Sequence, residues 1–167
     1  MQQRVACLHA DVSGFCRLIA TDVNSTVRTL TTYRGVMIRT VGEHGGRVVD
    51  AAGDSLLATF GSASDALRCA VVIQRELETH NAGLPPSRRM KFRVGIDLGE
   101  VLVEGGRIYG DCVNIAARVQ QVAPAGSIYL AGSAYDHIDA ALPLRLEYLG
   151  EREVRSIDKP QRLYRVE

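Results

Sequence analysis

Residues 5–15 of the chain are VACLHADVSGF, an apolar run that ends at an acid and is followed by a small turn containing serine and glycine. The run over residues 5–10 predicts a buried strand, because a short apolar segment bounded by turn residues is typical of one. Ser13 and Gly14 predict that a helix opens there and covers residues 15–20. Asp11 therefore stands where a buried strand ends and a helix begins.

Outward from this strand, hydrophobic periodicity divides the rest of the chain into helices and strands. Helices are predicted at residues 24–44, with Asn24 or Ser25 as the N-cap, and at residues 62–81, 111–122 and 133–138. Strands are predicted at residues 47–50 and 55–60 around a turn over residues 51–54, at residues 91–97, at residues 101–103 after a turn at Gly99, and at residues 128–130, 144–148, 151–154 and 162–166. This order predicts an α+β sandwich with helices on one face of a mainly antiparallel sheet.

The composition predicts one soluble globular domain over residues 1–167, since 46% of the residues are hydrophobic and 23% are charged. The formal net charge is +1, so no broad field attracts nucleic acid or an anionic membrane surface. Neither a charged-then-apolar leader nor an apolar run of about 18 residues occurs, which argues against a signal peptide and a membrane span.

The cysteines and histidines show no ligand spacing. Cys7 and Cys69 lie in apolar runs and are interpreted as small core residues, and the scattered pattern of all four cysteines suits a reducing cytoplasm. A cytoplasmic location is therefore expected. The four histidines are interpreted as structural or solvent-facing.

Two carboxylates occupy positions where a fold normally avoids them. Asp11 ends the apolar strand, and Asp54 lies at the tip of the apolar hairpin of residues 47–60. If the first strand pairs beside that hairpin, both acids meet at one edge of the sheet. Two hard oxygen ligands with room for water and phosphate describe a Mg²⁺ or Mn²⁺ site. Taken singly, each acid has a plainer interpretation, Asp11 as a helix cap and Asp54 as a turn aspartate.

Asn114 and Arg118 are four residues apart in a predicted helix and therefore share one of its faces. An amide followed by a guanidinium is suited to holding a ribose and a phosphoryl oxygen. The alternative is a surface pair beside a packing stripe formed by Ile115, Ala116 and Val119.

Three stretches resemble the catalytic domain of class III adenylate and guanylate cyclases: ADVSGF at residues 10–15, GDSLLATF at residues 53–60 and GDCVNIAAR at residues 110–118. They follow one another in the family's order and at its spacing, and the resemblance extends over nearly the whole chain. It implies a ferredoxin-like palm with a βαββαβ core, a small C-terminal α/β extension and a hairpin. It also implies a head-to-tail homodimer with two active sites at its interface, in which one subunit supplies the metal-binding aspartates and the other supplies Asn and Arg.

The activity that the resemblance implies is conversion of a nucleoside triphosphate into its 3′,5′-cyclic monophosphate and pyrophosphate, for intracellular signalling. By position, Asp11 and Asp54 would bind two Mg²⁺ or Mn²⁺ ions at each site, helped by the carbonyl of Val12. A helix start would cradle the β- and γ-phosphates. The backbone N–H groups implied there are those of Ser13, Gly14 and Phe15.

The resemblance assigns the remaining roles to three polar side chains. Asn114 would orient the ribose, and Arg118 would stabilise charge on the α-phosphate as it becomes five-coordinate. Arg155 falls where the family usually has a lysine that reaches the terminal phosphates, and a solvated hairpin charge explains it as well. No side chain need be the general base, because a metal ion lowers the pKa of the ribose 3′-hydroxyl.

The chain departs from the family at the two positions that read the base. Adenylate cyclases usually carry Lys four residues before the second metal Asp and Asp seven residues before the ribose Asn, where this chain has Asp50 and Arg107. In one interpretation the exchanged pair still binds adenine, if the base shifts. In a second it suits guanine, because a carboxylate can accept from N1–H and N2–H while a guanidinium donates to O6. In the third, Asp50 and Arg107 pair with each other and do not contact the base. Guanylate cyclases resemble the chain at position 50 but not at 107. ATP is favoured and GTP is the alternative, since adenylate cyclases are frequent among bacterial relatives.

A catalytically silent cyclase-like module, which dimerises or senses nucleotide, is the alternative function. The altered base-reading pair supports this alternative. Against it, a degenerate site would more often lose a metal ligand, and none of the expected metal ligands is lost here. A diguanylate cyclase is disfavoured because no Gly-Gly-Asp/Glu-Glu-Phe turn occupies the hairpin. The expected partners are the nucleoside triphosphate and a second copy of the chain, without nucleic acid or membrane contact, and fused regulatory domains would lie outside this chain.

Overall fold

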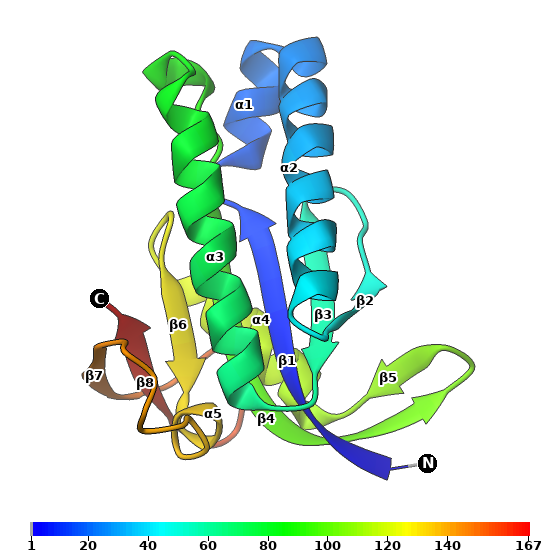
Figure 1. Cartoon of the computed structure of the whole chain (residues 1–167), viewed down its shortest axis with the longest axis vertical. Coiled ribbons are helices and arrows are strands. Elements are labelled where there is room, and N and C mark those ends of the chain that lie inside the picture. Colours follow the sequence, from blue (N-terminus) through cyan, green and yellow to red (C-terminus); the bar gives the residue numbers. More distant parts are fainter. Residues whose placement is uncertain (1) are drawn as a thin grey trace.

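The strand predicted at residues 5–10 is part of a longer one, β1 (Gln2–Val12), in the interior of a single sheet (Figure 1). The computed structural model describes residues 2–167. The other strands are β2 (Arg47–Asp50), β3 (Ser55–Phe60), β4 (Phe92–Glu104), β5 (Arg107–Tyr109), β6 (Ile128–Ala131), β7 (Leu146–Arg152) and β8 (Gln161–Val166). The α-helices are α1 (Phe15–Thr21), α2 (Val23–Glu43), α3 (Ala63–Ala82), α4 (Asp111–Val122) and α5 (Gly132–Tyr135).

The strand pairing is that of a ferredoxin-like palm. β2, β3, β1 and β4 lie side by side in that order, and each neighbouring pair is antiparallel. α1 and α2 connect β1 to β2, and α3 connects β3 to β4. α4 then leads to β6, which pairs parallel to β4, and β8 and β7 extend the sheet as an antiparallel hairpin. The predicted α+β class, the palm and the mainly antiparallel sheet are confirmed.

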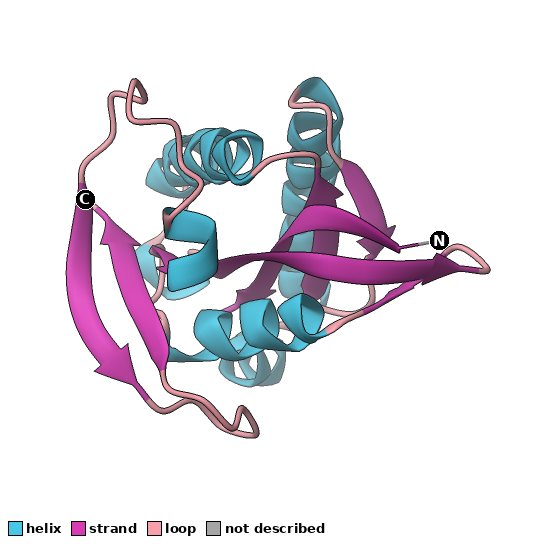
Figure 2. Cartoon of the chain, turned by 90° about the horizontal axis from the view of Figure 1, so that it is seen from below, coloured by secondary structure: helices cyan, strands magenta, loops and turns pink. Residues whose placement is uncertain are grey.

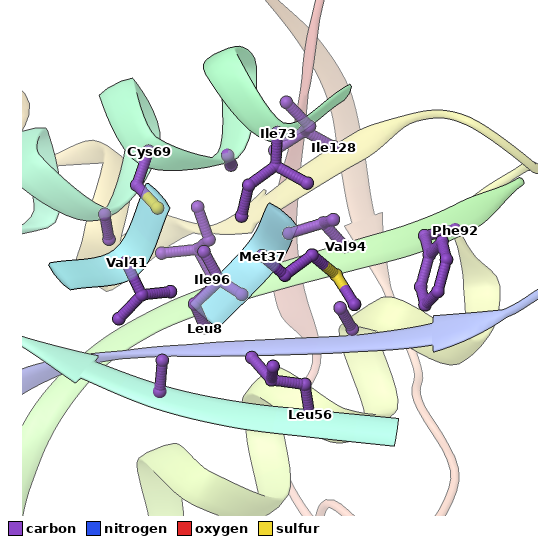
Figure 3. Close-up of a cluster of buried hydrophobic side chains, with 14 of the residues drawn as sticks. Leu8, Met37, Val41, Leu56, Cys69, Ile73, Phe92, Val94, Ile96 and Ile128 are labelled. Carbon is purple, nitrogen blue, oxygen red and sulfur yellow. The ribbon is translucent and has the colours of Figure 1, made fainter. Parts of the chain in front are cut away.

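β1 presents two buried faces, because its side chains alternate between the two sides of the sheet. Ala6, Leu8 and Ala10 belong to the large core under α2 and α3, part of which is drawn in Figure 3. Val5 and Cys7 belong to a smaller core under α4. Figure 2 shows helices on both sides of the sheet, so the prediction that they cover one face is wrong. The run of consecutive apolar residues in β1 is the sequence signal for this double coverage.

The turn predicted at Gly99 lies six residues further along the chain. β4 continues through Gly99 to Glu104, and a Cβ at position 99 would lie 2.9 Å from the Cβ of Cys112, so the missing side chain lets α4 approach the strand. The chain turns instead at Gly105 and Gly106, whose φ angles of 60° and 76° suit a tight hairpin between β4 and β5.

Two smaller predictions also need correction. α2 is capped by Asp22, whose carboxylate accepts a hydrogen bond from the backbone N–H of Ser25 at 3.0 Å, rather than by Asn24 or Ser25. The strands predicted at residues 144–148 and 151–154 are one strand, β7. Its register on β8 shifts between Tyr148 and Gly150, which keeps the strand continuous through a bulge.

Cys7 and Cys112 meet between the sheet and α4, although they are 105 residues apart in the chain. Their Sγ atoms are 3.2 Å apart, and both side chains are buried. The hydrogen bond to Cys112 and burial raise the pKa of Cys7, so this thiol packs as a neutral group. Cys69 is buried in the other core, as predicted.

Across residues 2–167, no helix combines the length and the apolar character needed to cross a membrane.

Asp97 of β4 is a buried acid whose ionisation makes the free energy of unfolding depend on pH. Its side chain accepts hydrogen bonds from the Ser133 hydroxyl and from the backbone N–H of Leu98, and it is 2% exposed. Burial nevertheless raises its pKa from 3.8 to about 6. Because the pKa of Asp97 is higher in the folded state than in the unfolded state, binding of its proton stabilises the fold. This stabilisation is complete below pH 3.8 and is lost as the pH rises through about 6.

We therefore expect the Asp97→Asn variant to be about 3 kcal/mol more stable than the unmodified chain at neutral pH, and equally stable at about pH 3.5. Urea unfolding across this pH range measures the difference. Asp65→Asn, at an exposed acid paired with Arg68, serves as the control and should change the free energy by less than about 1 kcal/mol. An Asp97→Asn variant that is the less stable protein at neutral pH would contradict this account.

Candidate active site

The two acids predicted to bind metal lie at the same end of neighbouring strands. β1 pairs with β3 so that Asp11 stands opposite Ser55, and Asp54 directly precedes Ser55. Gly53 turns the chain with φ 58°, and Arg34 of α2 donates a hydrogen bond to the carbonyl of Gly53. The expected pairing of the first strand beside the hairpin is confirmed, and it brings the backbones of the two acids together.

Asp11 is a partly buried acceptor with three N–H donors. Arg93, opposite it on β4, donates from Nε to Oδ1 at 3.1 Å and from Nη2 to Oδ2 at 3.0 Å. Gln120 of α4 donates from Nε2 to Oδ1 at 2.5 Å. Sequence reasoning missed both partners. The available signal was a charged residue, Arg93, between the apolar residues Phe92 and Val94 of one strand.

Asp54 is half-buried, and no ion pair or side-chain hydrogen bond within residues 2–167 engages it. Together with Asp11 it offers the hard oxygen donors that Mg²⁺ and Mn²⁺ prefer. In the described part of the chain, no group of three or more His, Cys, Asp and Glu side chains is arranged so that it could hold a metal ion by itself. An ion here would therefore complete its shell with water, phosphate and backbone oxygens such as the Val12 carbonyl. This donor set fits a divalent ion that takes part of its shell from outside the chain.

The loop after β1 differs from the prediction at one residue. The backbone N–H of Ser13 donates to the carbonyl of Lys91 at 2.9 Å, because the contact between β1 and β4 continues past the last strand residue. This N–H is therefore not open to a phosphate. Gly14 adopts φ 69° and precedes α1, which begins at Phe15, and its carbonyl accepts the first helical bond from Leu18. The N–H groups of Gly14 and Phe15 remain at the open start of the helix.

Asn114 and Arg118 lie on the side of α4 that faces away from the sheet. Ala116 is buried against the sheet, whereas Asn114 is exposed and Arg118 is half-buried. Arg118 donates from Nη1 to Oε1 of Gln121 at 3.0 Å. Within residues 2–167, no hydrogen bond or ion pair joins Asn114 or Arg118 to the acids of β1 and β3.

His9 lies on the same face of β1 as Asp11 and bonds through Nδ1 to Oε1 of Gln120 at 3.0 Å. Burial lowers the pKa of His9, against the opposing effects of the Gln120 bond and of the charges on Asp11, Asp50 and Asp54. The imidazole is therefore neutral at pH 7 and structural, in line with the interpretation of the histidines.

Asp50 and Arg107 line one cavity of about 530 Å³ between the β2–β3 hairpin and the β4–β5 hairpin. Its other lining residues are Val49, Leu57, Gly105, Gly106, Ile108 and Tyr109. Both charged side chains are exposed, and within the described residues no ion pair joins them. This arrangement disfavours the interpretation that the two charges only neutralise each other. The cavity is of the size that small-molecule sites usually have.

Arg155 lies in the exposed loop between β7 and β8. β1 is antiparallel to β4, β4 is parallel to β6, and β6 is antiparallel to β8, so β8 runs parallel to β1. The loop that precedes β8 therefore lies at the end of the sheet where β1 begins. Asp11 lies near the other end of β1. One chain therefore does not bring Arg155 to its own acids.

The family described as the adenylate and guanylate cyclase catalytic domain matches residues 1–167. A curated relative, putative adenylate cyclase 3 of Rhizobium meliloti, is 34% identical over 160 residues, which cover 95% of this chain and 27% of the relative. The uncharacterized protein Rv1359 of Mycobacterium tuberculosis is 34% identical over 153 residues, which cover 90% of this chain and 58% of that protein. The chain thus spans only part of the length of these relatives.

Solved structures share the fold over almost the full length of both chains. An adenylate/guanylate cyclase/hydrolase from Silicibacter pomeroyi has a TM-score of 0.87 and 31% identity, and the match covers 99% of this chain and 97% of that one. The adenylyl cyclase CyaB from P. aeruginosa also has a TM-score of 0.87, with 19% identity and coverage of 100% and 95%. At this lower identity, the likeness to CyaB speaks for the fold alone.

The close approach of α4 to β4 at Gly95 generates a stability prediction. A Cβ at position 95 would lie 2.3 Å from the carbonyl oxygen of Ala116 and 2.5 Å from the backbone nitrogen of Gln120, so Gly95→Ala must displace α4. We expect a loss of about 1–3 kcal/mol in urea unfolding. Gly35→Ala, in α2 with no atom within 4 Å of the new Cβ, is the control and should gain about 0.5–1 kcal/mol. Equal effects of the two substitutions would contradict the role given to Gly95.

Proposed function

We propose that this chain, which belongs to the family of adenylate and guanylate cyclase catalytic domains, converts a nucleoside triphosphate into its 3′,5′-cyclic monophosphate and pyrophosphate, with ATP as the favoured substrate. One observation carries the proposal. Asp11 and Asp54 lie at one end of neighbouring strands, while Asn114 and Arg118 occupy the outward side of α4. The chain thus retains both halves of a phosphoryl-transfer site but keeps them apart.

A second copy of the chain would unite the two halves. In a head-to-tail dimer, the outward side of α4 in one copy would face the acids of the other, and the two-fold symmetry would generate two equal sites. The exposure of Asn114 supports this arrangement, since an exposed amide is available to a partner without any change in the fold. The proposed partner is therefore a copy of this chain.

Mg²⁺ or Mn²⁺, two ions per site, would lower the pKa of the ribose 3′-hydroxyl and neutralise charge on the triphosphate. Asp11 and Asp54 would hold these ions against the substrate. Arg93 now binds both oxygens of Asp11, so an ion must share or displace these hydrogen bonds. We expect Asp54, which has no partner within residues 2–167, to accept an ion more readily than Asp11.

The other copy would orient the substrate and stabilise developing charge. Asn114 would accept or donate a hydrogen bond at the ribose and hold the 3′-hydroxyl near the α-phosphate. Arg118 would place its guanidinium against the α-phosphate oxygens, where negative charge builds up as the phosphorus becomes five-coordinate. The backbone N–H groups of Gly14 and Phe15 would bind the terminal phosphates from the acid-bearing copy.

The cavity between Asp50 and Arg107 is the proposed place for the base. Asp50 would accept from the exocyclic amine of adenine, and Arg107 would donate to a ring nitrogen. Guanine is the second candidate, because the same carboxylate suits N1–H and N2–H and the same guanidinium suits O6. ATP is proposed first because several of the named curated relatives, such as putative adenylate cyclase 3, are called adenylate cyclases.

Mixing two inactive variants tests the shared site. Asp11→Ala should lose the ions and Asn114→Ala the ribose contact, so each alone should lower turnover at least about a hundredfold. A mixed dimer keeps one intact site and should recover up to about a quarter of the unmodified activity, if the copies exchange freely. Cyclic product formed with Mn²⁺ measures this. Failure of the mixture to recover activity, with both variants folded and dimeric, would contradict the proposal.

Base selectivity is tested with Mn²⁺ and each of ATP, GTP, CTP and UTP, followed by chromatography of the products. We expect ATP to give the highest kcat/KM, and Arg107→Ala to lower the ATP/GTP ratio by about tenfold while cyclisation continues. Arg28→Ala, at an exposed arginine of α2, is the control and should leave the ratio unchanged. If no triphosphate yields a cyclic product, the chain is the silent module instead of an enzyme.

A further inference from the structure

Gln120 is a buried amide whose two ends contact two side chains of β1. It is 1% exposed, its Nε2 lies 2.5 Å from Oδ1 of Asp11, and its Oε1 lies 3.0 Å from Nδ1 of His9. An ionised carboxylate only accepts hydrogen bonds, so the NH₂ end of Gln120 faces Asp11 and its oxygen accepts from the His9 N–H. The amide is thus fixed at both ends and cannot turn its donor away from Asp11.

The spacing along β1 and the depth of α4 make this bridge possible. His9 and Asp11 are two residues apart on one strand, so their side chains leave the same face about 7 Å from each other. Gly95 stands opposite His9 on β4, and its lack of a side chain admits the backbone of Gln120. A side chain of glutamine length can then reach between the two residues of β1.

A second connection ties the end of α4 to the same carboxylate. Arg93 donates from Nη1 to the backbone carbonyl of Gln121 at 2.9 Å while its other N–H groups bind Asp11. Arg118 in turn donates to the side chain of Gln121. The last turn of α4 is therefore bonded to Asp11 directly through Gln120 and indirectly through Arg93.

We propose that Gln120 is a positioning residue for Asp11, whose amide fixes the carboxylate in the orientation that receives the divalent ion. This inference rests on the proposed function, because only then does Asp11 hold an ion. In the head-to-tail dimer, Asp11 serves one active site while α4 of the same chain presents Asn114 and Arg118 to the other. The α4 helix that positions Asp11 in one active site would then supply Asn114 and Arg118 to the other active site of the dimer.

Loss of the amide should weaken binding of the divalent ion more than binding of the nucleotide. Without Gln120, Asp11 is left to Arg93, and an ion must order the carboxylate as it binds. Residues that orient a metal ligand in this way typically change metal affinity or activity by 10–100-fold when they are replaced. A purely structural role would instead lower stability and leave the ion requirement unchanged.

The first test replaces Gln120 with methionine, which is similar in length and apolar. In Gln120→Met we expect the Mn²⁺ concentration for half-maximal cyclisation to rise about tenfold or more, with KM for ATP at saturating Mn²⁺ within about twofold of the unmodified value. Binding of Mn²⁺ in the presence of a non-cyclisable ATP analogue, followed by the electron paramagnetic resonance of the free ion, should weaken by the same factor. This second readout does not depend on turnover.

Gln74→Met is the matched control, because Gln74 is another helical glutamine whose amide bonds to the backbone near β4. Its Nε2 donates to the carbonyls of Phe92 at 2.9 Å and Ser127 at 3.2 Å, without touching Asp11. It should lower stability and leave the Mn²⁺ requirement within about twofold. If Gln120→Met fails to fold, Gln120→Asn keeps the polar group but is too short to span His9 and Asp11, and the same rise is expected.

Mixed dimers decide which site Gln120 supports. Asp11→Ala mixed with Asn114→Ala leaves one active site, whose Asp11 belongs to the Asn114→Ala chain. Adding Gln120→Met to that chain should raise the Mn²⁺ requirement, whereas adding it to the Asp11→Ala chain should not. An equal rise in both placements, or no rise in either, would overturn the inference. A mixture that is inactive before Gln120 is changed would instead count against the proposed function.

Discussion

The backbone of α4 lies directly on β4 at Gly95, and the arrangement of the site depends on this contact. Because no Cβ intervenes, the carbonyl of Ala116 and the N–H of Gln120 occupy the space where a side chain would be. The close approach places the amide of Gln120 beside Asp11 and, two turns earlier in the helix, the thiol of Cys112 against Cys7. If a side chain at position 95 held α4 further from the sheet, neither contact would form.

The two sides of α4 differ in their surroundings. Its buried side packs on the sheet and reaches Asp11, while its outward side presents Asn114 and Arg118. A single chain therefore separates the acids from the amide and the guanidinium, although the same helix holds both. This separation is the physical basis of the proposed dimer, since a copy of the chain is the simplest body that offers the missing half. It also means that the packing of one helix would affect two active sites.

The charges around the site are local, since the chain as a whole carries a formal net charge of only +1. Asp11 is held by Arg93 and Gln120, so its negative charge is already balanced before any ion binds. Asp50 and Arg107 face one cavity without forming an ion pair within residues 2–167. Two unpaired groups of opposite sign are suited to the mixed donors and acceptors of a purine edge, which agrees with a nucleotide as the ligand.

The sequence by itself determined the features that depend on local pattern: the order of helices and strands, the mainly antiparallel sheet, and the acids at the ends of β1 and the hairpin. The palm followed from the resemblance to a known family. Alternation, helical spacing and turn residues act over a few positions, so they can be recognised in the sequence alone. Only the tertiary structure decided that α4 covers the second face of the sheet, that Gly99 admits a helix instead of turning the chain, and that the N–H of Ser13 is already bonded. It alone brought Arg93 and Gln120 to Asp11. These outcomes depend on contacts between segments far apart in the chain, and the packing distance between two elements is fixed by both of them together.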